Sequence, residues 1–127
     1  MSQRDKFNTT CKAKCHCGAV VVEIPGVPEK VTECNCSICR RLGALWVYHA
    51  LEDVSLCYAD GATNTYAWGE KTLEFHRCKI CGCITHWLPL SEKYTAMGIN
   101  ARMIDGLCST DVEVVHEEYG GAGCFWS

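Results

Sequence analysis

The sequence predicts an all-β domain whose loops are organised around bound metal. Three observations support this prediction: short β-branched and aromatic runs, turn residues between them, and cysteine clusters at their ends. The chain has 127 residues, of which 12 are cysteine, 48% are hydrophobic and 21% are charged. This length fits one domain with its own core. We expect residues 11–127 to form that domain, after a flexible tail over residues 1–10.

The strands expected in the first half of the chain are short and end at turn residues. Residues 19–24 form a β-branched run that Pro25 stops. Residues 45–50 combine aromatic and β-branched side chains, and residues 54–58 alternate with period two before the turn signal Asp60-Gly61. The first half is therefore expected to contribute three strands.

A hairpin is expected in the second half, where Gly69-Glu70-Lys71 joins the strands predicted over residues 64–68 and 72–76. The same β-branched and aromatic composition predicts three later strands, the first of them broken by Pro89. These strands cover residues 84–88, 94–100 and 112–116.

Three cysteines lie close together in the stretch Cys34-Asn35-Cys36-Ser37-Ile38-Cys39. Their spacing lets three sulfurs converge on one point from one turn of chain, as zinc requires. Residues 40–42 are expected to continue as a short helical turn that ends at Gly43. The fourth tetrahedral position is either filled by a distant ligand, as in a structural site, or open, as in a catalytic site. This stretch alone leaves both alternatives open.

The expected compartment determines what the cysteines do. Residues 1–6 are polar and lack the apolar stretch of a signal peptide, and no apolar run approaches the ~20 residues of a membrane span. We therefore expect a cytoplasmic protein without a membrane partner, in which clustered cysteines bind metal in preference to forming disulfides. A net charge of −3 also argues against a nucleic-acid partner, which usually requires a basic surface.

A second ligand set is divided between two distant segments. Cys15 and Cys17 precede a glycine, and Cys78 and Cys81 form a C-x-x-C pair that also precedes a glycine. Each pair is incomplete alone, so together they predict a closed four-cysteine site with structural zinc. The triplet is then left without a fourth partner of equal quality, which favours an open site. No role is assigned to the other cysteines: Cys11, Cys57, Cys83, Cys108 and Cys124.

Four runs carry a resemblance to a known family. They are C-H-C-G-A-V at 15–20, C-N-C-S-I-C-R-R-L-G at 34–43, K-T-x-E-x-H-x-C-x-x-C-G at 71–82 and N-A-R-M-I-D-G at 100–106. The chain resembles the glutathione-dependent formaldehyde-activating enzyme family, also called the centromere protein V-type domain family, over roughly residues 11–120. The resemblance implies an all-β, Mss4-like fold with two zinc ions. It assigns structural zinc to the four-cysteine set and a second zinc, where glutathione would bind, to Cys34, Cys36 and Cys39.

The resemblance also implies a reaction between two small molecules, a thiol and an aldehyde. In this family formaldehyde and glutathione condense reversibly to S-hydroxymethylglutathione, and the reverse reaction is that of a carbon–sulfur lyase. Coordination to zinc would deprotonate the thiol, and the thiolate would attack the aldehyde carbon. Tyr48 and His49 are candidate proton donors, and Arg40 or Arg41 could bind a glutathione carboxylate.

Two interpretations without this catalysis remain. One is a two-zinc, Mss4-like module that binds a protein partner; it predicts a filled fourth position and an exposed apolar patch around Trp46, Trp68 or Trp87. The other is a thiol-based redox or metal-buffering protein, suggested by the additional cysteines. We favour the enzyme. The sequence does not define the oligomeric state.

Overall fold

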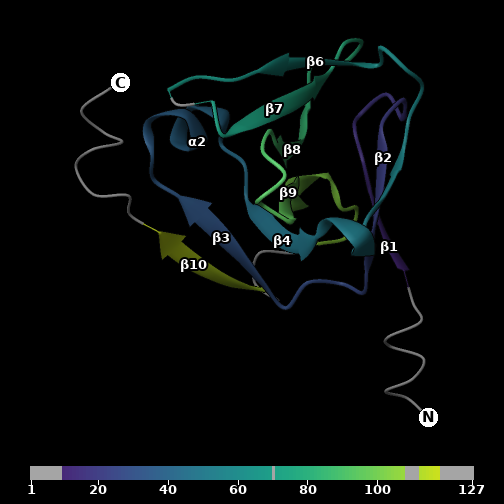
Figure 1. The fold of residues 1–127 in the computed structure, drawn as a ribbon. Coiled ribbons are helices and arrows are strands. Elements are labelled where there is room, and N and C mark those ends of the chain that lie inside the picture. The colour runs from purple at the N-terminus through teal and green to yellow at the C-terminus, as the bar shows by residue number, and fades with distance from the viewer. Residues whose placement is uncertain (1–9, 70, 108–111, 118–127) are drawn as a thin grey trace.

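The computed structural model describes residues 10–69, 71–107 and 112–117. Within these residues, strands form two sheets and one short α-helix lies beside the larger sheet (Figure 1). The strands are β1 (Thr10–Lys14), β2 (Val21–Pro25), β3 (Lys30–Cys34), β4 (Trp46–Ala50), β5 (Ser55–Cys57), β6 (Thr63–Tyr66), β7 (Leu73–Cys78), β8 (Ile84–Pro89), β9 (Ala96–Asn100) and β10 (Glu113–Glu117). The helical segments are α2 (Ser37–Leu42) and the 3₁₀ turns η1 (Leu51–Asp53) and η2 (Ala101–Met103).

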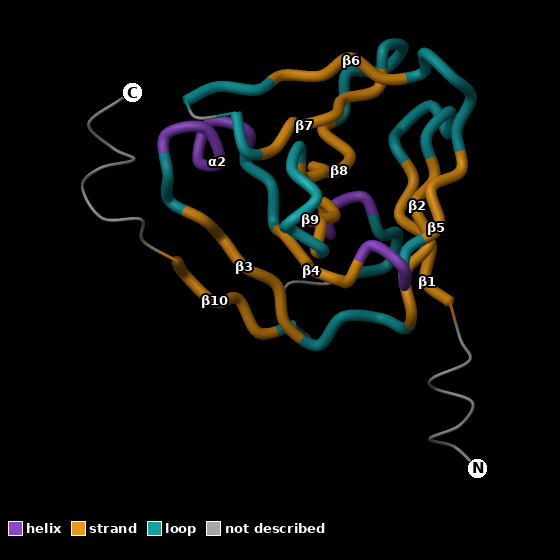
Figure 2. The backbone as a smooth tube through the Cα atoms, viewed as in Figure 1, coloured by secondary structure: helices purple, strands orange, loops and turns teal. Residues whose placement is uncertain are grey.

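The smaller sheet is antiparallel, with the order β1-β2-β5 (Figure 2). Strand β1 was not predicted, although its residues alternate between the core and solvent. Cys11 and Ala13 are buried, whereas Lys12 and Lys14 are exposed. Because the buried side chains of β1 are small and unbranched, the strand lacks the composition that usually marks one.

The larger sheet has the order β10-β3-β4-β9-β8-β7-β6. The pair β10 and β3 is parallel and the other pairs are antiparallel, including the predicted β6–β7 hairpin. The all-β prediction and the short helix are confirmed, but the helix begins at Ser37, inside the cysteine triplet. Further details differ from the prediction: β3 is a strand where none was predicted, β8 continues through Pro89, and the 3₁₀ turns η1 and η2 follow β4 and β9 without having been predicted.

The two faces of the larger sheet have different partners. One face buries Val31, Met97 and Ile99 in the same hydrophobic cluster as Val22 and Ile24 of the smaller sheet. The opposite face carries a second cluster with helix α2, formed by Cys34, Cys39, Ala44, Trp46 and Phe75. Since successive side chains of a strand point to opposite faces, the sheet separates the main core from the surroundings of the triplet.

Two residues of the 100–106 run hydrogen-bond to the segment that follows helix α2 and to strand β8. The Asn100 side chain accepts from the Leu45 N–H (3.4 Å) and donates to the Ile84 carbonyl (2.8 Å). The Arg102 Nε–H donates to the carbonyl of Gly43, the residue that caps α2 (2.8 Å). This run therefore holds the elements around the triplet in place.

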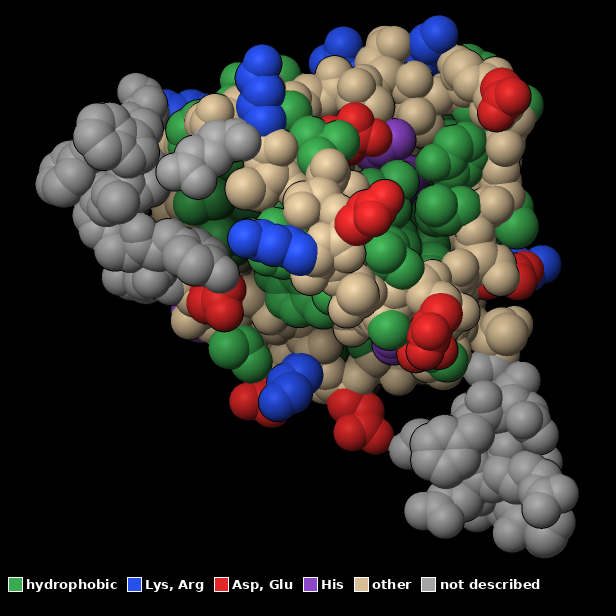
Figure 3. All heavy atoms as spheres, in the orientation of Figure 1, with side chains coloured by type: hydrophobic (Ala, Val, Ile, Leu, Met, Phe, Trp, Pro, Cys, Tyr) green, Lys and Arg blue, Asp and Glu red, His purple; other side chains and the backbone are tan. Residues whose placement is uncertain are grey.

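On the face shown in Figure 3, acidic and basic side chains are interspersed and hydrophobic side chains are visible between them. No helix in the described part of the chain is long and apolar enough to cross a membrane.

Candidate metal centres and an aromatic cavity

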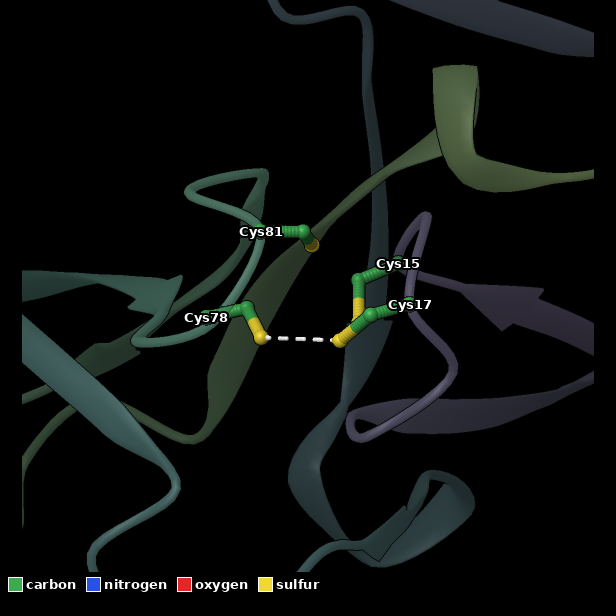
Figure 4. A group of neighbouring side chains, drawn as sticks. All are labelled: Cys15, Cys17, Cys78 and Cys81. Atoms are coloured by element: carbon green, nitrogen blue, oxygen red, sulfur yellow. Dashed lines mark hydrogen bonds between the residues drawn. The ribbon is translucent and has the colours of Figure 1, made fainter.

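Four cysteines from distant segments meet between the two sheets. The sulfurs of Cys15, Cys17, Cys78 and Cys81 all lie within 4.8 Å of one another and converge from two loops (Figure 4). The Cys17 Sγ is 3.7 Å from that of Cys15 and 3.5 Å from that of Cys78. A tetrahedral zinc ion with Zn–S bonds of about 2.3 Å places its sulfurs about 3.8 Å apart. The four residues therefore fit a zinc ion.

The backbone around these four cysteines stabilises thiolates. Gly18 and Gly82 have φ angles of 84° and 79°, the left-handed conformation that glycine adopts without a steric cost. The turns that they complete direct N–H groups at sulfur: Val20 donates to Cys15 (3.3 Å) and Ile80 donates to Cys78 (3.4 Å). A hydrogen bond from the backbone of Cys83 is the main cause that lowers the pKa of Cys81 to about 5. Thiolates are the form that binds metal.

The triplet forms the second candidate metal centre. Cys34 ends β3, Cys36 caps α2, and Cys39 lies in the first turn of that helix. Their sulfurs also lie within 4.8 Å of one another, and no fourth Cys, His, Asp or Glu of the described residues joins them. The Cys39 N–H donates to the Cys36 sulfur (3.4 Å). Hydrogen bonding from Cys39 lowers the pKa of Cys34 to about 6 and raises the pKa of Cys39 itself. The three sulfurs fit zinc with one position left for another ligand.

A cavity of about 270 Å³ lies next to the triplet on the outer face of the larger sheet. Aromatic rings form much of its wall: the ring centroids of Trp46 and Phe75 are 6.0 Å apart, and those of Tyr48 and Trp87 are 6.1 Å apart. Of the lining residues that the structure describes, none is a Lys, Arg, Asp or Glu. They are Cys34, Cys36, Ile38, Cys39, Trp46, Tyr48, Trp68, Thr72, Leu73, Phe75 and Trp87.

A second, polar pocket of about 360 Å³ also reaches the triplet. Cys34 and Cys39 line both spaces, so the polar pocket and the aromatic cavity adjoin at these two residues. Polar and charged side chains mark the polar pocket, including Arg40 and the pair His116 and Glu33, whose Nδ1 and Oε1 atoms are 2.7 Å apart. The triplet therefore adjoins two chemically different surroundings.

The structure brings together only some of the predicted non-cysteine site residues. Tyr48 lines the aromatic cavity, and Arg40 lines the polar pocket. His49 follows Tyr48 in β4 and so points to the opposite face of the sheet, where burial lowers its pKa. The Arg41 Nη1 donates to the Ser37 carbonyl within its own helix (2.9 Å). Neither His49 nor Arg41 lines the aromatic cavity or the polar pocket.

The cysteines without an assigned role lie in different places. Cys11 is buried in the main core, and Cys57 is exposed on β5. Cys83 lies beside the four-cysteine set, where it interacts electrostatically with Cys81 and Cys15. Cys108 and Cys124 lie outside the described residues.

The cavity itself was not predicted from the sequence. Trp46, Trp68 and Trp87 were expected only around an exposed apolar patch of a protein-binding module, whereas all three line the cavity, and Leu73 and Phe75 had no predicted role. These residues come from β4, β7, β8 and the connection between β6 and β7. The period-two pattern of each strand marks one face, but the pattern does not show which strands are neighbours.

The fold and these centres define a class: small β domains with two cysteine clusters suited to zinc, one of four residues and one of three beside a cavity. The sequence model of the glutathione-dependent formaldehyde-activating enzyme family matches residues 10–119, and the chain belongs to this family. It is also similar to a protein of Rhodobacter sphaeroides known from a crystal structure. The sequence identity is 29% and the TM-score is 0.69, over 84% of this chain and 98% of that chain.

Proposed function

We propose that the protein forms and cleaves adducts between a thiol of the glutathione type and an aldehyde, the reaction of a carbon–sulfur lyase. The observation that carries this proposal is the three-cysteine cluster. It has no fourth ligand among the described residues and lies against a cavity large enough for a small molecule. Membership of the family supports the same reaction class.

Zinc held by Cys34, Cys36 and Cys39 would lower the pKa of a thiol at its remaining position and so provide a thiolate at neutral pH. The sulfur then adds to the aldehyde carbon. A carbon–sulfur bond forms, the carbonyl π pair moves to oxygen, and this oxygen takes up a proton in place of the one that the thiol released. The overall reaction needs no oxidant or reductant.

The chain's own residues would position the reactants and supply the proton. The Tyr48 phenol lines the cavity and would donate a proton to the new alkoxide, or accept one in the cleavage direction. In the polar pocket, which Cys34 and Cys39 also line, Arg40 would bind a carboxylate of the thiol. The aromatic walls would exclude water from the carbonyl and strengthen these polar interactions.

A titration of the cobalt-substituted protein with glutathione tests the proposal. We expect two cobalt ions per chain and a saturable change in the visible bands of one of them. Cys36→Ser should remove the responding ion and keep the other, whereas Cys57→Ser, at an exposed position on β5, should change neither. If both ions are present and glutathione changes neither spectrum, the proposal is wrong, and a non-catalytic protein-binding module becomes the better explanation.

Catalysis has a separate test. Tyr48→Phe should slow adduct formation by about 10²-fold or more and leave glutathione binding to cobalt unchanged, as expected for the loss of a general acid. An unchanged rate would exclude Tyr48 as the proton donor.

A further inference from the structure

The wall of the aromatic cavity is a poor match for formaldehyde. Five of the lining residues are aromatic, and Ile38 and Leu73 add aliphatic surface. Apart from the cysteines, its polar side-chain atoms come from Tyr48, Thr72 and the tryptophan indoles. Formaldehyde would cover little of this apolar surface. Water would then remain against the rings at a cost in free energy.

The size of the cavity leads to the same conclusion. Its volume of about 270 Å³ is about nine times the ~30 Å³ that one water molecule occupies in the liquid. Formaldehyde has two non-hydrogen atoms, whereas this space accommodates a six-membered ring with its substituents. Trp46 is 1% exposed and Phe75 is 6% exposed, so the inner part of the wall is fixed by packing in the second hydrophobic cluster.

The charged parts of a glutathione-type thiol have a different place to bind. Such a thiol carries carboxylates and an ammonium group, and among the described residues no Lys, Arg, Asp or Glu side chain lines the aromatic cavity. The polar pocket provides both signs of charge, because Arg40, Glu33 and Glu117 all line it. Because Cys34 and Cys39 border both spaces, one adduct at the triplet can extend its peptide into the polar pocket and its other substituent into the aromatic cavity.

We infer that the aldehyde of this reaction carries an apolar group the size of a ring, as an aryl aldehyde does, and that this group occupies the aromatic cavity. The inference rests on the proposed function. The bond changes are those of the adduct reaction described above: the aldehyde carbon gains the sulfur, and its oxygen takes up the proton. The cavity then distinguishes aldehydes by the substituent on that carbon.

The test compares two stable adduct analogues with the zinc-loaded protein. S-benzylglutathione and S-methylglutathione share the peptide and the sulfur and differ by one phenyl ring. Burying about 60 Å² of that ring at ~25 cal/mol per Å² corresponds to about tenfold tighter binding, measured by calorimetry. Equal affinities, or tighter binding of the methyl analogue, would overturn the inference.

Two variants locate the effect. Trp68→Ala removes a ring from the cavity wall at a position that is 36% exposed, where truncation leaves the core intact. It should reduce the advantage of the benzyl analogue by about fivefold. Tyr66→Ala is the matched control: it removes another exposed ring, which does not line the aromatic cavity, and the advantage should persist. Equal effects of the two variants would contradict binding in this cavity.

Failure of this inference can be distinguished from failure of the proposed function. If glutathione changes the cobalt spectrum but the benzyl analogue has no advantage, the thiol–aldehyde reaction stands and the aryl substrate class is wrong. If the benzyl advantage depends on Trp68 while glutathione leaves the cobalt spectrum unchanged, the cavity binds apolar groups but the proposed reaction is wrong. Benzyl mercaptan, a thiol that carries the same ring, tests whether the ring belongs to the thiol. If it displaces glutathione from cobalt while the benzyl analogue has no advantage, the apolar group is part of the thiol. The inference about the aldehyde then fails.

Discussion

Substitution of Gly98 by alanine should distort the aromatic cavity by displacing Trp87, a residue of its wall. Gly98 lies in β9, between Tyr48 of β4 and Trp87 of β8, and pairs with both. A Cβ at Gly98 would lie 2.1 Å from the Trp87 Nε1 and 2.7 Å from its Cε2. Such distances are far below van der Waals contact, so the Trp87 indole would have to move away from the Cβ on β9.

The expected cost follows from this contact. Overpacking of a packed site costs about 2 kcal/mol. At about 4 °C per kcal/mol for a domain of this size, the midpoint of thermal unfolding should fall by about 8 °C. Binding of S-benzylglutathione should also weaken, because Trp87 forms part of the cavity wall. Thermal unfolding would be followed by circular dichroism, with the zinc content of each sample measured.

The control is the same substitution after the indole has been removed. In a Trp87→Leu background, Gly98→Ala should cost nothing or stabilise by about 0.5 kcal/mol, since alanine loses less backbone entropy than glycine in a strand. If Gly98→Ala costs as much in that background as in the original chain, the indole contact does not explain the effect, and the reasoning is refuted.

Three further predictions concern the framework. Asn100→Ala should cost about 3 kcal/mol in denaturant unfolding, because the Leu45 N–H and the Ile84 carbonyl lose their partner; a cost below about 0.5 kcal/mol would contradict this role. Burial, with a smaller contribution from the charge of His76, lowers the pKa of His86 to about 3. The stability that neutral His86 provides should therefore be complete above pH ~6.5 and should be lost as the pH falls towards 3, at about 1 kcal/mol per pH unit. In His86→Asn, the free energy of unfolding measured between pH 7 and 4 should lack this pH-dependent loss. Cys78→Ser should remove one zinc ion per chain in metal analysis and destabilise the fold severely, and a variant that retained two ions would exclude Cys78 as a ligand.

The sequence predicts the cysteine clusters better than it predicts their surroundings. C-x-C and C-x-x-C spacings are local constraints, since a turn of a few residues determines where the sulfurs point. The cavity instead depends on β9 lying between β4 and β8, which brings Tyr48 and Trp87 to the same glycine. Strand order and register are long-range properties that no single period-two pattern specifies.

One feature of the site was present in the sequence pattern. Tyr48 and His49 are consecutive residues of a predicted strand, so their side chains must point to opposite faces of the sheet. Both could not face one cavity, and the structure places Tyr48 there. Strand β1 also alternates along Thr10–Lys14, but its buried residues are too small for composition to reveal it.

The parallel pairing of β3 with β10 also affects how the protein is made. Strand β3, which ends in Cys34, pairs with β4 only through Thr32 and Trp46, whereas its whole length pairs with β10. The Asn35 N–H adds a hydrogen bond to the Glu117 carbonyl (2.8 Å). A ribosome releases the triplet well before it has synthesised β10, so in the nascent chain the three thiols lie at the end of β3 and just after it while β3 still lacks its main neighbour. We therefore expect this centre to mature after translation, when the last described strand has joined the sheet, and the newly made thiols to need protection from oxidation until then.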